Sequence, residues 1–514
     1  MSKTIIIIGA GLAGLSAALQ AAENGCNVKL VSSLPSERAQ SVMAEGGINA
    51  ALNTKDENDS PEEHFTDTIK AACGLADPNA VWGMTQAAPE LVHWLLKLGV
   101  KFNMSGYDDV DLRNFGGQKK KRTAFAQSDT GKQIMTAMID AVRRKEASGM
   151  VERFSHHSFL TLRLCGNICC GCVIRDEYSQ ETVELPGDAV IVATGGMHGL
   201  FGNTTGSLSN TGEVTAELFR LGVPLANGEM IQYHPTTVKC GGKRMLISEA
   251  ARGEGGRLFA MKDGKQWYFM EEKYPELGNL MPRDITAREI WKVSHELEVF
   301  LDMTEISEEI ISNKLSGLAD DCMTYLHKDI RKEPVSVLPG IHYFMGGILV
   351  DEQHRTPIQN LYAAGECCAQ YHGANRLGGN SLLGALYGGR VAAKSACEQA
   401  DVVDLSCATQ IDFPPASQIS EIKQLNKVMQ ETMGVVRNEN TLLNGIQTVQ
   451  ALTGNLPLLG MAVLKSALAR KESRGAHWRE DYPKSNDDDY LKTTVARFDG
   501  KQIQISFVPV PERR

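Results

Sequence analysis

Five polar, glycine-rich blocks between residues 229 and 384 carry the side chains best suited to chemistry. They read EMIQYHPT, ISEAARGEGG, MPRD, HYFMGG and HGANRLGGNSLLG. Each block places a cationic or imidazole group beside residues that turn or end regular structure; these groups are His234, Arg252, Arg283, His342 and Arg376. Guanidinium and imidazole groups bind carboxylates, so five of them can converge on one anionic ligand. The blocks therefore predict a site for a small carboxylic acid.

The composition limits the classes of partner. A chain of 514 residues is long enough for several packed units and a large bound ligand. Its net charge of −9 does not favour nucleic acid or an anionic membrane surface. The one strong basic run, Lys119 to Arg122, is typical of a solvated loop. No apolar run approaches the roughly 20 residues that span a bilayer, and the N-terminus lacks a secretory signal pattern. We therefore expect a cytoplasmic chain that binds no nucleic acid.

The twelve cysteines lack the spacing of a disulfide framework, which favours a reducing compartment. Cys165, Cys169, Cys170 and Cys172 are close enough in sequence to raise the alternative of a metal or iron–sulfur site. The surrounding sequence, FLTLRLCGNICCGCVIRD, instead favours two alternating strands around a Gly-Asn turn, where cysteine is a small apolar residue. We therefore predict no metal site.

The elements that must position these groups begin at the N-terminus. Residues 4–8 are apolar and β-branched, as in a parallel strand buried on both faces. They are followed by GAGLAG at 9–14, a segment with helical periodicity, and the strand-like VKLVSS. This order is typical of a dinucleotide fold, in which glycines let the backbone approach a pyrophosphate at a helix N-terminus.

Two later segments indicate which dinucleotide the chain binds. The second strand ends at Ser32 and Ser33 instead of the acidic residue that usually binds ribose, so the first motif alone is ambiguous. AVIVATGGMHGLFG at 189–202 and NLYAAGECC at 360–368 are further strand and glycine units. Three separated returns to one sheet favour FAD over NAD, because an extended flavin dinucleotide is contacted along its whole length.

The rest of the chain divides by composition. Charged and aromatic residues increase between 229 and 342, and apolar residues at spacings of three and four follow residue 417. We predict an α/β protein with a Rossmann-like FAD-binding domain, an inserted α+β capping domain and a C-terminal helical domain. The predicted bounds are 1–228 with 343–405 for the FAD-binding domain, 229–342 for the cap, 415–480 for the helical domain, and 481–514 for an extension with a strand pair turned at Asp499–Gly500.

Further blocks complete a recognisable set: AEGGINAAL at 44–52, RNFGGQKKKRTAFAQSDTG at 113–131 and AAGE at 363–366. With them, the chain resembles the flavoprotein subunits of fumarate reductases and succinate dehydrogenases over nearly its full length. L-Aspartate oxidase is a near relative with the same architecture, but residues 113–122 are less similar to that enzyme. The resemblance implies an FAD-dependent oxidoreductase of electron transport and anaerobic respiration, which reduces fumarate by hydride transfer from reduced flavin or oxidises succinate in reverse.

The resemblance also implies roles for individual residues. His234 and Ser248 would bind one carboxylate, and His342 and Arg376 the other. Arg283 would transfer the proton, while Glu249 and Arg252 would connect it to solvent. Two such clamps would exclude monocarboxylates, which leave one set of buried polar groups unpaired. The expected FAD contacts are Gly9, Gly11, Ala13, Gly14, Ser32, Ser41, Ala44, Gly46, Gly47, Ala193, Thr194, Gly195, Glu366, Ser381 and Leu382.

One position departs from the family. Its membrane-bound members attach FAD covalently through a histidine six residues before the Gly-Gly of the AEGG block, and Gln40 occupies that position here. Glutamine cannot attack the flavin methyl group, so we expect non-covalent FAD. Covalent attachment generally raises the flavin potential in this family, and its loss therefore favours fumarate reduction over succinate oxidation.

The resemblance leaves several alternatives open. The chain could be the catalytic subunit of a complex with an iron–sulfur subunit, held at the inner face of the membrane through its partners, or a soluble enzyme with another electron donor. L-Aspartate oxidation and reduction of another unsaturated carboxylic acid are the alternative reactions. No electron-carrier motif of its own is evident in the sequence, so we expect an outside donor.

Overall fold

The computed structural model describes residues 2–401, 413 and 418–514. A central five-stranded sheet runs in the order β20-β10-β1-β2-β6 with every neighbouring pair parallel. Its strands are β1 (Thr4–Ile8), β2 (Asn27–Ser32), β6 (Val151–Ser155), β10 (Ala189–Val192) and β20 (Leu361–Ala363). The α/β prediction is confirmed, and segments near residues 5, 190 and 362 lie side by side as the three strand and glycine units predicted.

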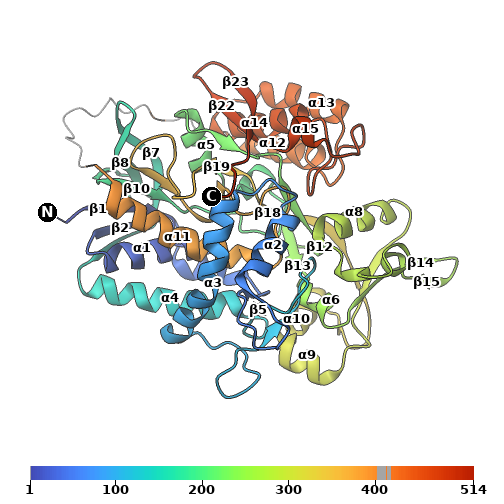
Figure 1. Ribbon diagram of the computed structural model, residues 1–514. Helices are drawn as coiled ribbons and strands as arrows, with labels where there is room; N and C mark the ends of the chain where they lie inside the picture. Colours follow the sequence, from blue (N-terminus) through green and yellow to red (C-terminus); the bar gives the residue numbers. More distant parts are fainter. Residues whose placement is uncertain (1, 402–412, 414–417) are drawn as a thin grey trace.

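The side chains of β1 alternate between the two faces of the central sheet, and each face is covered by different elements. Ile5 and Ile7 pack into a cluster with the helices α1 (Leu12–Glu23), α4 (Thr130–Ala147) and α11 (Asn380–Gln399), which lie along one face in Figure 1. Ile6 and Ile8 pack on the opposite face, against a second sheet. Since successive side chains of a strand point to opposite faces, four consecutive isoleucines give a strand buried on both sides.

That second sheet contains the cysteine segment. It is formed by β7 (His157–Cys165), β8 (Ile168–Asp176) and β9 (Thr182–Pro186), and β7 pairs antiparallel with β8 as predicted. Cys169 and Cys172 are buried in the apolar cluster beneath β1, and burial raises the pKa of the Cys169 thiol to about 12. Such thiols are poor metal ligands because the thiolate is disfavoured. Within the described residues, no group of three His, Cys, Asp or Glu side chains could hold a metal ion.

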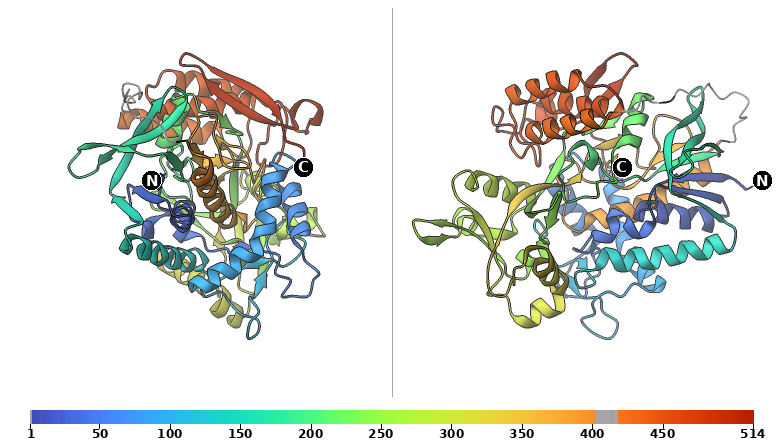
Figure 2. Two further views of the ribbon diagram at one scale, coloured as in Figure 1. Left: turned by 60° about the vertical axis from the view of Figure 1, so that its left-hand side comes forward. Right: turned by 180° about the vertical axis from the view of Figure 1, so that it is seen from behind.

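Buried residues between 247 and 337, joined by Phe115, share one apolar cluster in the lobe that is drawn green to yellow in Figures 1 and 2. Its inner sheet has the order β13-β12-β18 and is antiparallel; the outer sheet has the order β15-β14-β16-β17. The bounds are β12 (Ile231–Cys240), β13 (Lys243–Leu246), β18 (Leu338–Phe344), β14 (Arg257–Lys262), β15 (Lys265–Trp267), β16 (Val299–Asp302), β17 (Val335–Ser336), α6 (Glu249–Gly253), α7 (Phe269–Lys273), α8 (Arg283–Val293), α9 (Glu308–Lys314) and α10 (Ser316–Asp321).

The C-terminal part packs three helices over the glycine segments that follow β10. These helices are α12 (Ile419–Thr432), α13 (Glu439–Gln450) and α14 (Asn455–Ala469), and their leucines share a cluster with Met197 and Phe344. The antiparallel pair β22 (Lys492–Phe498) and β23 (Ile503–Pro509) joins β11 (Leu225–Ala226), β19 (Gly347–Leu349) and β21 (Cys368–Ala369) in another sheet. The proposed domain boundaries at 405 and 415 fall outside the described residues.

The chain end returns to the first half of the molecule. Arg513 places its guanidinium 3.8 Å from the ring centroid of Trp82 on α3 (Pro78–Leu98), and both views of Figure 2 show the C-terminus beside the blue helices. Further short elements are α2 (Pro61–Ala71), α5 (Glu213–Arg220), α15 (Asp487–Tyr490), β3 (Ile48–Asn49), β4 (Leu112–Arg113) and β5 (Thr123–Ala124). No helix in the described part of the chain has both the length and the apolar character needed to cross a membrane.

The basic run Lys119 to Arg122 corrects one expectation. Arg122 is fully buried, with Nη2 2.8 Å from Asp59 Oδ1 and Nη1 3.0 Å from Asp67 Oδ2. Only part of the predicted solvated loop is therefore exposed, because two carboxylates from α2 and the segment before it compensate the buried charge.

Replacing Arg122 should destabilise the fold. Arg122→Met leaves two unpaired buried carboxylates, and removing one partner of a buried ion pair costs about 3–5 kcal/mol of unfolding free energy. Thermal unfolding of the FAD-loaded protein should show a lower midpoint, while Lys119→Met, at an exposed position three residues earlier, should unfold like the wild type. Equal midpoints for the two variants would contradict the structural role of Arg122.

Candidate active site

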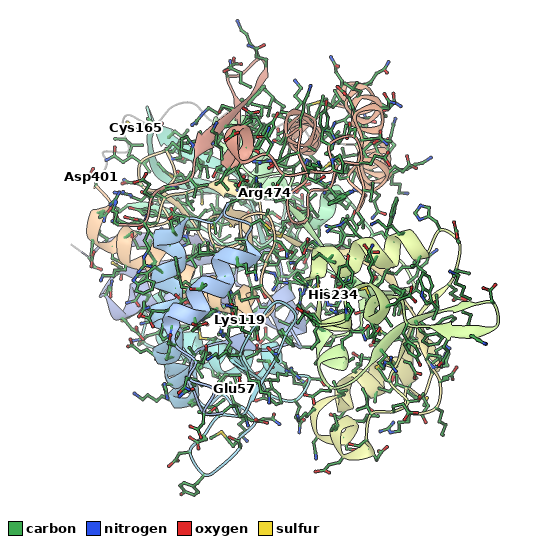
Figure 3. The ribbon with its side chains drawn as sticks, turned by 45° about the vertical axis from the view of Figure 1, so that its right-hand side comes forward. Glu57, Lys119, Cys165, His234, Asp401 and Arg474 are labelled. Carbon is green, nitrogen blue, oxygen red and sulfur yellow. The ribbon has the colours of Figure 1, made fainter. Side chains whose placement is uncertain are left out.

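One cavity of about 870 Å³ collects most of the residues singled out in the sequence. It runs from the glycine turn after β1 to the inner sheet of the 231–344 lobe, and Figure 3 shows His234 where that lobe meets the rest of the molecule. The lining includes His234, Ser248, Glu249, Arg283, His342 and Arg376, together with every expected FAD contact except Gly14. Arg252 lies just outside the lining, behind Glu249.

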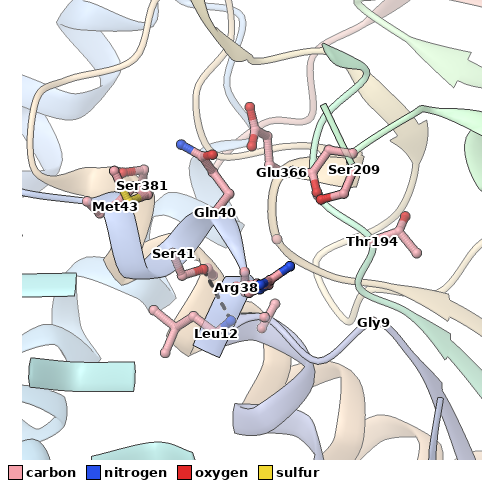
Figure 4. A pocket seen from close by; sticks show the side chains of 18 of the residues that line it. Gly9, Leu12, Arg38, Gln40, Ser41, Met43, Thr194, Ser209, Glu366 and Ser381 are labelled. Carbon is pink, nitrogen blue, oxygen red and sulfur yellow. Dashed lines mark hydrogen bonds between the residues drawn. The ribbon is translucent and has the colours of Figure 1, made fainter. Parts of the chain in front are cut away.

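The half of the cavity at the parallel sheet has the features of a dinucleotide site. The carboxyl ends of β1, β2 and β10 open into it, the edge at which α/β sheets bind ligands. Helix α1 starts after Gly11 without a side-chain cap, and the Leu12 amide donates to Ser41 Oγ at 3.2 Å (Figure 4). The helix N-terminus therefore faces the cavity with backbone N–H groups suited to a pyrophosphate.

Two glycines of the first motif have different roles. Gly9 has φ of 109°, and a Cβ there would lie 2.3 Å from the Ala193 carbonyl oxygen, so only glycine allows β1 and the 193–195 segment to meet at the cavity. A Cβ on Gly14 would lie 1.9 Å from the Gly9 carbonyl oxygen. Gly14 therefore permits close packing of α1 on the turn and does not itself line the cavity. The size of the cavity, the sheet edge and the glycines together fit FAD.

Gln40 lies at this cavity, in the short helical turn Gln40–Met43. Figure 4 shows its side chain together with those of Ser41 and Glu366 around the same space. Glu366 accepts a hydrogen bond from the Phe344 amide at 3.0 Å. Gln40 therefore lines the cavity that fits FAD, with an amide at the position where the resemblance implies a flavin-linking histidine.

At the opposite end of the cavity, His234 on β12 and His342 on β18 have ring centroids 5.1 Å apart. Burial and the nearby positive charge of Arg283 keep the pKa of both imidazoles well below the ordinary value, so both are neutral near pH 7. Thr205 Oγ1 lies 2.8 Å from His342 Nδ1, and the Thr236 amide lies 3.3 Å from His234 Nδ1. When Thr205 donates to Nδ1, His342 retains an Nε2–H for a carboxylate oxygen. His234 Nδ1 also lies 3.1 Å from the Thr236 carbonyl oxygen, so its Nε2 carries the proton when Nδ1 accepts from the Thr236 amide instead.

Arg376 supplies an uncompensated cation at the same end. It is buried, its guanidinium lies 4.4 Å from the ring centroid of Tyr343, and its Nε has no hydrogen-bond partner among the described residues. Burial, followed by the charge of Arg283, lowers the pKa of Arg376 to about 9. A buried arginine in this state gains most from an anionic ligand that completes its hydrogen bonds.

Arg283, Glu249 and Arg252 form a continuous buried chain. Arg283 Nε donates to Glu249 Oε2 at 2.7 Å, and Arg252 Nη2 lies 3.3 Å from Glu249 Oε1. Burial acts to raise the pKa of Glu249, but the charges of Arg283 and Arg252 lower it overall. Glu249 is therefore ionised and links two cations, only one of which lines the cavity.

Several residues that contact the site residues were not predicted from the sequence. Gln232 Oε1 accepts from Arg283 Nη1 at 3.2 Å, and its position two residues before His234 on one strand was a usable signal. Thr205 lies in a polar loop with no distinguishing pattern. His198 lies outside the recognised blocks, yet it is buried with Nε2 3.7 Å from Glu366 Oε1.

Comparisons with known proteins show the family of this chain. The family model described as FAD binding domain matches residues 4–382, and the one described as Fumarate reductase flavoprotein C-term matches residues 452–513. The succinate dehydrogenase flavoprotein subunit of Bacillus subtilis is 38% identical over 100% of this chain and 98% of its own length. The 8-methylmenaquinol:fumarate reductase flavoprotein subunit of Wolinella succinogenes is 32% identical over 100% and 92%.

A solved structure of quinol fumarate reductase FrdA from E. coli superposes with a TM-score of 0.90 at 27% identity, covering 99% of this chain and 97% of that chain. The cavity, the family models and these relatives lead to the same assignment. The chain belongs to the flavoprotein subunits of the succinate dehydrogenase and fumarate reductase family, and it is an FAD-dependent oxidoreductase.

Proposed function

We propose that this chain reduces fumarate to succinate as the flavoprotein subunit of a fumarate reductase. The observation that carries the proposal is the buried chain Arg283–Glu249–Arg252, whose first member lines the same cavity as the two neutral histidines and Arg376. This arrangement offers a path for a proton together with groups for two carboxylates. A monocarboxylate would leave Arg376 or His234 without a ligand, at a cost that favours dicarboxylates.

His234 and Ser248 would hold one carboxylate, and His342 and Arg376 the other. Ser248 is the N-cap of α6, so its hydroxyl lies beside the positive end of a short helix. Both histidines would donate Nε2–H groups, and Arg376 would donate from a planar fork that matches a carboxylate. Held at both ends, the substrate has little freedom to rotate, which brings the reacting carbons into one fixed orientation.

Reduced FAD, when bound, would supply a hydride to one alkene carbon. The proton for the neighbouring carbon would come from Arg283, which lines the cavity beside the clamps. Arginine is a reluctant acid in water, and the Glu249 carboxylate that accepts from its Nε would offer a route for its reprotonation. Glu249 would then return a proton from Arg252, which lies on the far side of the carboxylate. Electron density on the substrate would be stabilised meanwhile by the charge of Arg376 and by the hydrogen bonds to its two carboxylates.

Gln40 supports the direction of the proposal. Without the linking histidine, FAD would be bound non-covalently and at a lower potential, which favours donation of electrons to fumarate. Protein precipitated with acid should therefore lose its yellow colour to the supernatant, because unfolding releases a cofactor held only by the cavity. An untreated sample passed through a desalting column should keep its colour. Yellow colour that stays with the acid pellet would contradict non-covalent binding.

A substrate comparison tests the proposed reaction. With reduced viologen as electron donor, fumarate should be reduced rapidly, whereas acrylate and aryl acrylates should react at least about 100-fold more slowly, since each lacks the second carboxylate. Oxidation of L-aspartate with consumption of oxygen or fumarate would instead identify an L-aspartate oxidase. Faster turnover of a monocarboxylic acrylate would identify a reductase of another unsaturated acid.

We also propose that an iron–sulfur subunit supplies the electrons. The relatives are named as subunits, and the Wolinella succinogenes protein is named for a menaquinol donor. Such a partner would bring the chain to the inner face of a membrane, although the described residues contain no membrane-crossing helix. Purification of the native protein under anaerobic conditions tests this: a copurifying polypeptide with iron and acid-labile sulfide supports it, and a flavoprotein purified alone with full quinol activity contradicts it.

A further inference from the structure

A second cavity of about 340 Å³ lies behind the histidines. Tyr233 and Ile341 line it, whereas their chain neighbours His234 and His342 line the first cavity. Tyr233 and Ile341 are register partners on β12 and β18, so this strand pair separates the two spaces. Successive side chains of a strand point to opposite faces, which explains how one strand pair serves both cavities.

Arg244 is the charged residue common to both linings. It lies on β13, and its amide donates to the Thr204 carbonyl at 3.2 Å. Its Nη1 donates to Thr237 Oγ1 at 3.0 Å, and it forms no ion pair with a described carboxylate. No aspartate or glutamate lines the second cavity. Arg244 is therefore the permanently charged residue of that described lining, which also contains His295, and it has no counter-ion there.

The position of Arg244 is built into the sheet. A Cβ on Gly340 would lie 2.5 Å from Arg244 Cδ and 2.7 Å from Thr237 Oγ1. Because Gly340 has no side chain, the aliphatic part of Arg244 has room to lie across β18 between the two cavities. A surface arginine would need no such accommodation.

When FAD is bound, the substrate needs a second route to the histidines. FAD would occupy the long arm of the first cavity, from Gly9 to Glu366, and would close that route to the histidines. The second cavity lies on the other side of the strand pair and has a volume suited to a small ligand. In its lining, the Tyr233 hydroxyl donates to the Met433 carbonyl at 2.9 Å, and the Gln430 amide donates to the Phe201 and Asn203 carbonyls. Those donors are occupied, so Arg244 is the cationic group that an anion would meet there.

We propose that the second cavity is an antechamber for the dicarboxylate and that Arg244 passes the anion from it to the catalytic site. The inference rests on the proposed function and adds a route and a residue to it. A guanidinium without a counter-ion that lines both cavities would attract a dianion into the second cavity and remain in contact with it as it enters the first. Arg244 is therefore a positioning residue for substrate capture and has no role in the chemical step.

Two variants test the antechamber by independent means. Arg244→Gln removes the charge. Gly434→Phe fills the cavity without altering Arg244, because a Cβ at 434 meets nothing closer than the Val436 carbonyl oxygen at 3.7 Å. Lys423→Gln is the control, since it removes an exposed cation of α12 that lines neither cavity. Arg244→Lys keeps the charge, and FAD content with the thermal midpoint reports folding of each variant.

Kinetics with fumarate and reduced viologen should separate capture from chemistry. Arg244→Gln should raise KM about 10-fold, at the lower end of electrostatic steering effects, with kcat nearly unchanged. The wild-type KM should rise between about 10 and 100 mM salt, where the Debye length falls from about 30 to 10 Å, and Arg244→Gln should lose most of this dependence. Arg244→Lys should retain most of it, Lys423→Gln should match the wild type, and Gly434→Phe should raise KM at both salt concentrations.

Stopped-flow measurement of fumarate association with the oxidised enzyme, followed by flavin absorbance, gives a readout independent of turnover. A slower association in Arg244→Gln and Gly434→Phe is expected. Wild-type values of KM and association rate in both variants would overturn the antechamber while leaving fumarate reduction intact. A wild-type enzyme that binds fumarate without reducing it would overturn the proposed function alone, and one that neither binds nor reduces fumarate would overturn both.

Discussion

Arg283→Gln is expected to lower kcat for fumarate reduction by about 10⁴-fold, the combined loss of a proton donor and of a cation at the reacting carbons. Glutamine fills part of the same space and still hydrogen-bonds, but it cannot deliver a proton. Fumarate should continue to bind, because the histidines and Arg376 are untouched. The measurement is steady-state reduction with reduced viologen, paired with a fumarate titration of the oxidised enzyme.

A matched arginine on the same helix provides the control. Arg288 is five residues along α8, pairs with Asp284 at 3.3 Å and does not line the cavity. Arg288→Gln should retain kcat within about 3-fold, an effect below 1 kcal/mol on the barrier. An Arg283→Gln enzyme that keeps more than a tenth of wild-type kcat would show that the proton comes from another group.

The second large effect is expected on the binding of fumarate. Arg376→Leu should weaken fumarate binding by about 10⁴-fold, because the variant leaves a substrate carboxylate without its main partner in a buried site. Leucine is tolerated sterically and removes a buried cation, so FAD binding and folding should be preserved. A raised KM with an intact flavin spectrum is the expected combination.

Arg376→Lys distinguishes charge from geometry. Lysine restores the positive charge but cannot form a planar fork over Tyr343, so binding should recover only in part. An unchanged KM in Arg376→Leu would mean that the ligand does not contact this arginine. Together with Arg283→Gln, the pair separates binding from chemistry within one cavity.

Local sequence patterns were enough to predict the first strand, glycine turn and helix of the FAD-binding part. Four consecutive isoleucines, a glycine turn and a segment with helical periodicity are encoded within 23 residues, and they fold as β1, the turn and α1. The glycine at position 9 was informative because the required φ and the close approach of Ala193 leave no room for a side chain. Such signals are short-range, so one sequence suffices to find them.

Contacts between residues far apart in the chain could not be predicted from local sequence patterns. Arg122 is buried by Asp59, 63 positions earlier in the chain, and nothing near either residue indicates the pairing. Thr205 meets His342 from 137 positions away. The helices α12 to α14 were expected from their spacing, but their packing over Met197 and Phe344 depends on the tertiary fold. Periodicity predicts which face of a helix is buried without showing what will cover it.

A single-turnover experiment tests the central claim most directly. The holoenzyme is reduced chemically under anaerobic conditions, freed of excess reductant and mixed with fumarate, and both flavin absorbance and product are measured. Rapid flavin reoxidation with one succinate formed for each FAD is expected in the wild type, and no matching reoxidation is expected in Arg283→Gln. Flavin that stays reduced in the wild type although fumarate is bound would contradict fumarate reduction at this site.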